Sequence, residues 1–207
     1  MTNDELKNLL FTRAENLIKD GQIRQFVLEA LKQAPVYIWT MPASTSGKHH
    51  TGETQTEHVL KALTVAEKLM TAIKSGLKHG YGANVSTDLL YAAVILHDLY
   101  KCGLPGQENR DIEGNVRTDP MHPLYPAVAL RNIAWDDPYN GQCKIKACKC
   151  DWWSSFTLCV AAHMGPWSPM PRDIDNIMSS LGNLALMTFL SDYLSCQKGI
   201  TVDIDEG

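Results

Sequence analysis

An imidazole and a carboxylate stand side by side in this sequence, at His97-Asp98, where a run of apolar residues ends. Imidazole nitrogen and carboxylate oxygen are common ligands of divalent metal ions, so the pair could hold such an ion. The competing interpretation is an ordinary helix C-terminus, where His97 interacts with the helix dipole and Asp98 turns outward. For an isolated pair the competing interpretation would be preferable, and the rest of the chain decides between the two.

Four more residues of the same two types lie on or at the ends of separate apolar segments, namely His58, His122, His163 and Asp192. Each of them alone is explained equally well as a hydrogen-bonded core residue, because buried polar groups are normally paired. Six such groups that face one core are not explained in that way, because burying each of them costs free energy. Their joint occurrence indicates a metal centre.

The elements that must position these residues are helices, and the pattern predicts an all-α fold. Apolar residues recur at helical spacing over residues 4–20 and 23–31, which predicts an α-hairpin within residues 1–35, with a break at Asp20-Gly21. Residues 57–78 predict a helix with His58 on its core-facing side.

The apolar run at residues 89–96 leaves no solvated stripe, which is typical of a central helix enclosed by others. We expect Ser86 or Thr87 to cap its N-terminus. This helix delivers the pair His97-Asp98 at its end.

The second half of the chain predicts an irregular segment at 102–121, then a helix at 122–135 with Pro123 at its first position. Residues 136–151 read as an inserted excursion. A helix at 152–162 ends at His163, and a last helix at about 174–196 carries Asp192.

Composition limits the classes of protein to consider. The 207 residues suffice for one substantial core, so we expect one domain, and the net charge of −4 argues against a protein that wraps duplex nucleic acid. No apolar stretch is long enough to span a bilayer and the start does not resemble a signal peptide, so a cytoplasmic protein is expected.

Six cysteines are too few for a disulfide scaffold in a chain of this length. Cys143, Cys148 and Cys150 form a C-x4-C-x-C pattern, which is a weak zinc signal because a fourth ligand is missing. Free thiols are the preferred interpretation.

Residues 36–56 are rich in Ser, Thr, Gly and Pro, which predicts a loop. Lys48 and His50 in this loop could bind a phosphate or could simply be solvated. The spacing alone does not decide between these alternatives.

The order and spacing of the polar residues resemble the HD superfamily of metal-dependent phosphohydrolases, in which a histidine is followed by a His-Asp pair, later histidines and a final aspartate. The resemblance covers residues 42–192 and is closest to the branch that contains the HD-type 3′→5′ exoribonucleases. Five segments carry it, in chain order MPASTSGKHH, TEHVLKALTVAEKL, AAVILHDLYK, AAHMGPWSP and FLSDYL.

The resemblance implies an HD core over residues 42–196 and a phosphohydrolase that uses Mn, Fe, Co, Ni or Zn to activate water for attack on phosphorus. The metal ligands that it implies are His58, His97, Asp98, His122, His163 and Asp192. Asp98 is expected to bridge two metal ions, and Lys101 to stabilise negative charge on the phosphoryl group. Lys48, His50 and Lys101 are the implied substrate contacts, although Lys101 could instead be a surface lysine at a helix end.

Two departures from that branch bear on function. Relatives often carry a second histidine where this chain has Met164, so we expect one tight metal site and a weaker second one. The exoribonucleases also carry a separate oligonucleotide-binding domain, for which this chain has no room.

These departures leave three functional hypotheses. The leading one is hydrolysis of a nucleotide-like phosphomonoester or phosphodiester. The alternatives are a single-strand 3′→5′ exonuclease and a nucleotide-binding HD module without turnover. Of the tryptophans at segment ends, Trp135, Trp152, Trp153 and Trp167, one or two could stack a base, and the others are core or rim residues.

Overall fold

The structure is a computed structural model, and it describes residues 1–44, 52–76, 87–137, 142–143, 151–169, 182–197 and 200–204. Within these residues the fold is predominantly helical, which confirms the all-α prediction. The packed helices share one hydrophobic core. Among the described helices, none is both long and apolar enough to span a bilayer.

The chain begins with the predicted α-hairpin, formed by α1 (Asn3–Leu17) and α2 (Gly21–Lys32). Asp20 is the N-cap of α2, and its side chain accepts hydrogen bonds from the backbone N–H groups of the next helical turn. The two helices are separated by residues 18–20, so the break overlaps the predicted position at Asp20-Gly21.

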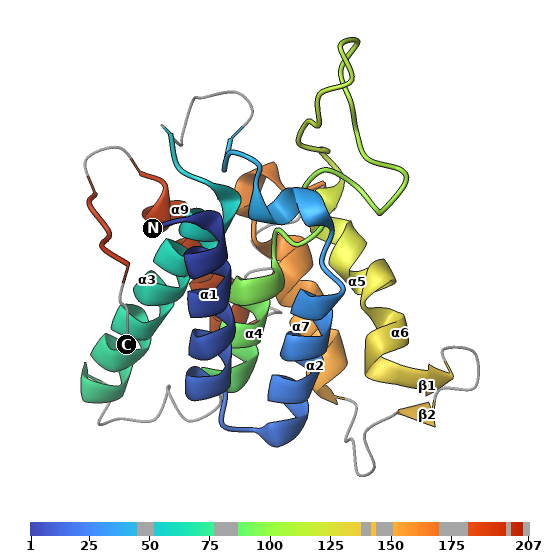
Figure 1. The fold of residues 1–207 in the computed structure, drawn as a ribbon. Helices are drawn as coiled ribbons and strands as arrows, with labels where there is room; N and C mark the ends of the chain where they lie inside the picture. Colours follow the sequence, from blue (N-terminus) through green and yellow to red (C-terminus); the bar gives the residue numbers. More distant parts are fainter. Residues whose placement is uncertain are drawn as a thin grey trace.

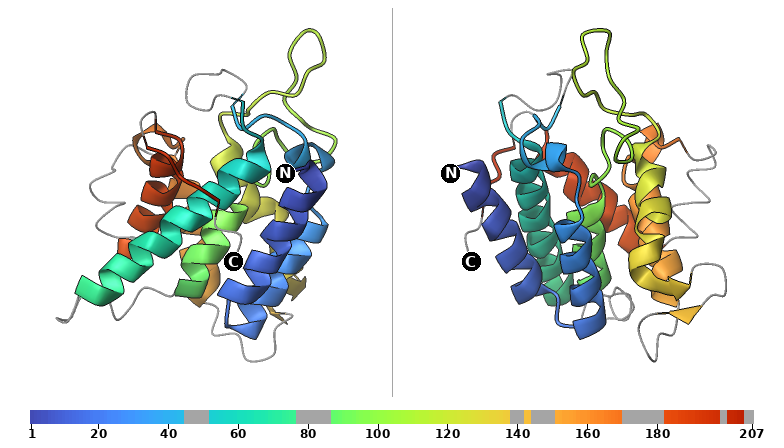
Figure 2. Two further views of the ribbon diagram at one scale, coloured as in Figure 1. Left: turned by 60° about the vertical axis from the view of Figure 1, so that its left-hand side comes forward. Right: turned by 45° about the vertical axis from the view of Figure 1, so that its right-hand side comes forward.

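Helix α4 (Thr87–Leu96) lies at the centre of the bundle, and all its residues from Leu89 to Leu96 are buried. It packs against both helices of the hairpin, against α3 (Gln55–Gly76), and against α7 (Asp151–Ala162) and α9 (Gly182–Ser195) (Figure 1). Helices α3 and α9 also pack against each other (Figure 2). The prediction of an enclosed central helix is confirmed.

Two predictions of local structure are wrong. The loop predicted after Pro35 begins with a short 3-10 helix, η1 (Val36–Trp39). The helix predicted at 122–135 is divided into η2 (His122–Leu124), α5 (Tyr125–Ala129) and α6 (Arg131–Ala134). Prolines stand at the first turns of η2 and α5, and a ring without an N–H group favours a new helix start over a continued helix.

The segment before η2 is irregular, as predicted, and contains an isolated β-bridge between Arg110 and Val116. It rises as a long loop above the helix ends (Figure 1). Residues 135–143 include a two-stranded antiparallel ribbon, β1 (Trp135–Asp137) and β2 (Gln142–Cys143), inside the predicted excursion. Residues 138–141 and 144–150 of the excursion and the predicted start of the last helix lie outside the described residues.

Candidate metal centre

All six predicted metal ligands meet at one end of the central helix. His97 and Asp98 follow α4 directly, and the other four residues come from four separate elements. His58 lies in the first turns of α3, His122 begins η2, His163 follows α7, and Asp192 lies on α9. The four histidines and Asp98 are buried, whereas the Asp192 side chain keeps 18% exposure.

His58, His97 and the two carboxylates form the first half of the cluster. Asp192 Oδ1 lies 3.0 Å from His58 Nε2 and 3.6 Å from His97 Nε2. Asp98 Oδ2 lies 3.5 Å from His97 Nε2 and 4.0 Å from His58 Nε2. Two imidazole nitrogens and two carboxylate oxygens thus surround one point.

The second half of the cluster uses the other oxygen of Asp98. Asp98 Oδ1 lies 3.0 Å from His122 Nε2 and 3.5 Å from His163 Nε2, and these two nitrogens are 3.3 Å apart. Asp98 therefore turns one oxygen toward each half.

The hydrogen bonds of three histidines fix which ring nitrogen carries the hydrogen. The Nδ1 atoms of His97, His122 and His163 each lie 2.6–2.7 Å from a backbone carbonyl oxygen three residues earlier in the chain. A carbonyl oxygen only accepts, so each Nδ1 carries the hydrogen and donates it. In a neutral ring the Nε2 lone pair is then free and faces the carboxylates.

His58 reaches the same state through a serine. The Ser195 hydroxyl donates to the backbone oxygen of Asp192 at 2.7 Å, so its oxygen accepts from His58 Nδ1 at 3.2 Å. His58 Nε2 is left facing Asp192. All four imidazoles thus offer the same nitrogen to the centre, an arrangement typical of metal-binding histidines with an oriented second nitrogen.

The distances and the unpaired atoms fit a bound cation. A cation about 2.0–2.2 Å from each ligand atom holds neighbouring ligand atoms about 3.0–3.5 Å apart, and most distances in both halves fall between 3.0 and 3.6 Å. Among the described residues, His97 Nε2 and Asp98 Oδ1 are buried without a hydrogen bond. Buried polar atoms are rarely left in this state, and a cation would satisfy both.

The surroundings shift the pKa values of His58 and His97 in opposite directions. Burial lowers the pKa of His58 to about 4, despite the nearby carboxylate of Asp192. Burial also disfavours the charged form of His97, but its contacts with Asp98 and Asp192 outweigh burial and raise its pKa to about 10. The carboxylates therefore create a strong preference for positive charge at His97.

Both carboxylates are held in the ionised form. Burial alone would raise the pKa of Asp98, but the charges of Lys101 and His97 hold it well below its usual range. The neighbouring imidazoles of His58 and His97 hold the pKa of Asp192 well below its usual range against its own burial. The centre therefore presents two negative groups to a cation.

The Oδ2 atom of Asp98 also accepts hydrogen bonds from two side chains. Lys101 Nζ donates at 2.6 Å, and Gln55 Nε2 donates at 3.0 Å. Gln55 is fully buried, and these contacts fix the orientation of the carboxylate between the two halves.

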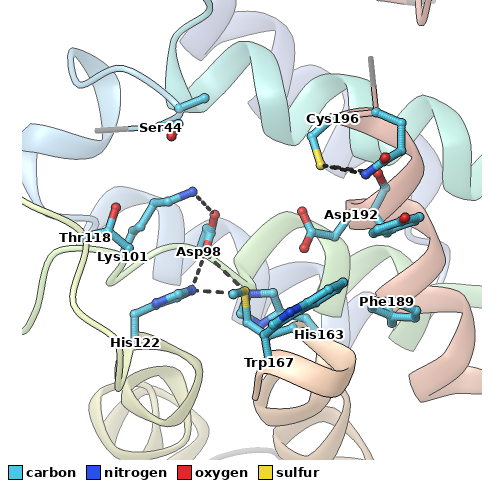
Figure 3. A pocket seen from close by; sticks show the side chains of 14 residues that line it. Ser44, Asp98, Lys101, Thr118, His122, His163, Trp167, Phe189, Asp192 and Cys196 are labelled. Carbon is cyan, nitrogen blue, oxygen red and sulfur yellow. Dashed lines mark hydrogen bonds and ion pairs between the residues drawn. The ribbon is translucent and has the colours of Figure 1, made fainter. Parts of the chain in front are cut away.

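A cavity of about 450 Å³ opens beside the cluster. Asp98, Asp192, His122 and His163 contribute to its wall, while His58 and His97 do not. Figure 3 shows Ser44, Lys101 and Thr118 on one side and Phe189, Asp192 and Cys196 on the other. A ligand in this cavity would contact the exposed edge of the candidate metal centre.

Of the four tryptophans proposed for stacking, the cavity contains Trp167. Trp152 and Trp153 instead pack edge-on against Phe26 in the core, with ring centroids 5.3 and 5.9 Å away. The sequence could not reveal this packing, because a core residue and a ligand-binding residue at the start of α7 have the same helical spacing. The Trp135 side chain lies outside the described part of the structure.

Lys48 and His50 also lie outside the described residues, as do Cys148 and Cys150. Cys102, Cys159 and Cys196 are free thiols.

Three contributors were missed by sequence reasoning, namely Gln55, Ser195 and Tyr193. Gln55 precedes His58 by three residues and Ser195 follows Asp192 by three, so helical spacing from a ligand was the available signal. Tyr193 lines the cavity immediately after Asp192.

Comparison with known proteins identifies no relative: no family model, curated protein or solved structure matches this chain.

Proposed function

We propose that this protein is a metal-dependent phosphohydrolase with an HD-type centre, acting on a nucleotide-like phosphomonoester or phosphodiester. One observation carries the proposal. Four buried imidazoles, each oriented through Nδ1, direct Nε2 toward two ionised carboxylates beside a cavity. With Nδ1 donating to an oxygen atom, each neutral ring turns its Nε2 lone pair toward the carboxylates or another ring, and a cation between these atoms would stabilise the arrangement.

The two halves of the cluster define the proposed ligand sets. His58, His97, Asp98 and Asp192 would hold one cation, and Asp98, His122 and His163 a second. Mixed nitrogen and oxygen ligands suit Mn, Fe, Co, Ni or Zn, and the ligand types do not choose among these metals.

The chemistry follows from the position of the cavity. Bound divalent cations acidify water and neutralise phosphoryl oxygens, which is what hydrolysis of a phosphate ester requires at neutral pH. Lys101 lines the same cavity, and we assign its ammonium group to a phosphoryl oxygen, where negative charge builds in the transition state. Asp98 orients this ammonium group from 2.6 Å.

Metal analysis followed by a substrate screen tests the proposal. The purified protein is analysed for transition metals, stripped, and reloaded separately with Mn²⁺, Co²⁺, Ni²⁺ and Zn²⁺. Each form is then assayed with mononucleotides, cyclic and linear dinucleotides, and oligonucleotides. We expect hydrolysis that requires a metal, and a protein that binds these metals without hydrolysing any phosphate ester would contradict the proposal.

A further inference from the structure

One side of the cavity is formed by aromatic rings. Trp167 and Tyr193 are nearly parallel, with an interplanar angle of 14° and ring centroids 6.2 Å apart. The ring centroid of Phe189 lies 5.5 Å from that of Tyr193. Trp167 is 64% exposed although all three residues line the cavity. An aromatic surface that stays open in a mostly apolar cavity with a few polar groups is a feature of ligand sites.

The rings are held close to the candidate metal ligands by the chain itself. Tyr193 directly follows Asp192 on α9, and Trp167 ends η3 (Gly165–Trp167), which begins two residues after His163. Gly165 has a φ of +52°, and a Cβ atom there would lie 2.5 Å from the Phe189 ring. Only glycine permits this close approach, so the position of Trp167 against α9 is built into the turn.

The opposite side of the cavity carries hydroxyl groups and one ammonium group. Ser44 and Thr118 provide hydroxyl groups, and among the described lining residues Lys101 is the single lysine or arginine. The described lining therefore offers one ammonium group beside the metal centre and one aromatic surface. This combination suits a ligand in which one phosphate group is attached to one flat ring.

We infer that Trp167 and Tyr193 form a binding site for the nucleobase of the substrate, which stacks on the indole while its phosphate lies at the metal centre. The inference rests on the proposed function, because it assigns the organic part of the same substrate. Stacking accepts every base, since each has a π face, so the site selects a ring rather than one particular base.

Adenosine tests the ring site without any phosphate. It has no ester to hydrolyse, so its binding can be measured by calorimetry whether or not the protein is a hydrolase, with ribose as the ligand that lacks the base. Removing a stacking partner weakens binding by about 10- to 100-fold, which we expect for Trp167→Ala, whereas Trp167→Phe retains most of the affinity. Val128→Ala is the matched control, because Val128 is equally exposed, at 65%, on α5 and lies outside the cavity lining.

A second comparison uses turnover. We expect the wild-type protein to prefer adenosine 5′-monophosphate over ribose 5-phosphate in kcat/KM by about 10- to 100-fold, and Trp167→Ala to reduce this ratio toward one while Val128→Ala keeps it. Equal binding of adenosine to the wild-type protein and to Trp167→Ala overturns the ring site, even if hydrolysis is found. The absence of any adenosine binding overturns it as well. Adenosine binding that depends on Trp167 supports the ring site even if no phosphate ester is hydrolysed.

Discussion

The Nε2 atoms of His122 and His163 lie 3.3 Å apart, although both rings carry their hydrogen on Nδ1. Two neutral rings in this state point lone pairs at each other, and Asp98 Oδ1 adds negative charge 3.0 Å from the first of them. A proton or a cation between these three atoms removes the repulsion. This geometry supports a second cation position.

The second cation is expected to bind more weakly than the first. The described residues offer it two histidines and a shared carboxylate, and the neighbouring Met164 supplies only a thioether, which borderline cations bind poorly. Calorimetric titration of stripped protein with Mn²⁺ should show one tight site and a weaker one. Met164→His should tighten the weaker site, while Leu158→His, an exposed position on α7, should not. Two equally tight sites in the wild-type protein would contradict this ranking.

Asp98→Ala should abolish activity and remove most bound metal, because each oxygen of this carboxylate serves one half of the cluster. The variant should remain helical by circular dichroism, since the apolar residues of α4 are unchanged. Metal content by mass spectrometry and turnover are the measurements.

Asp111→Ala is the matched control for this carboxylate. Asp111 is also ion-paired, to Arg117 at 2.6 Å, but lies outside the cavity lining. If Asp98→Ala kept the metal content and turnover of the control, the site would be misassigned.

The fold was largely predictable because it depends on apolar periodicity. The all-α class and the enclosed helix α4 follow from where Leu, Ile, Val and Ala recur. The division of residues 122–135 was less apparent, because Pro126 fits the first turn of a new helix as well as an interruption of an old one.

The convergence of the six site residues could be anticipated from their apolar surroundings, but their supporting contacts could not. The hydrogen bond from Gln55 to Asp98 joins residues 43 positions apart, and it depends on how α3 lies against the end of α4. The same holds for the ring pair of Trp167 and Tyr193, which comes from two separate elements. Sequence patterns indicate which face of a helix is buried, and not which residue of another helix meets it.

Lys101→Ala should lower kcat by about 10²–10³, the usual loss when a donor to developing charge is removed. Metal binding should persist, because the substitution removes a positive charge 2.6 Å from Asp98 and no ligand. Steady-state kinetics of the metal-loaded variant measure the effect. Lys61→Ala is the control, since Lys61 pairs with Glu53 at the same distance of 2.6 Å but does not line the cavity. Equal kcat values for the two variants would reject the assigned role of Lys101.

Gly165→Ala should destabilise the protein more than Gly106→Ala. Both glycines have positive φ, +52° and +78°, so each substitution carries the cost of a left-handed conformation, about 1–2 kcal/mol. At Gly106 nothing lies within 4 Å of the added carbon, whereas at Gly165 it meets the Phe189 ring at 2.5 Å. The clash should add about 1–3 kcal/mol. Urea unfolding of both variants measures the difference, and equal midpoints would show that the Phe189 contact relaxes freely.

The cavity lining predicts a preference for small substrates. A nuclease that holds a strand of several nucleotides needs a series of basic residues along the backbone and several stacking platforms. The described cavity lining has one lysine, Lys101, and one aromatic side formed by Trp167, Tyr193 and Phe189. The net charge of −4 adds no attraction for a polyanion. We therefore expect faster hydrolysis of mononucleotides or short cyclic or linear dinucleotides than of long RNA or DNA.

Competition among mononucleotides, dinucleotides and single-stranded oligomers, with Mn²⁺ at two salt concentrations, measures this preference. Each phosphate that a protein neutralises on a single strand contributes a slope of about −0.7 to the dependence of log affinity on log salt. A substrate whose phosphate meets Lys101 and the metal centre should show a shallow dependence, whereas a strand bound over many phosphates should show a steep one. Faster and strongly salt-sensitive turnover of the oligomers would therefore contradict the small-substrate prediction and favour the exonuclease alternative, with the strand bound by residues beyond the described cavity lining.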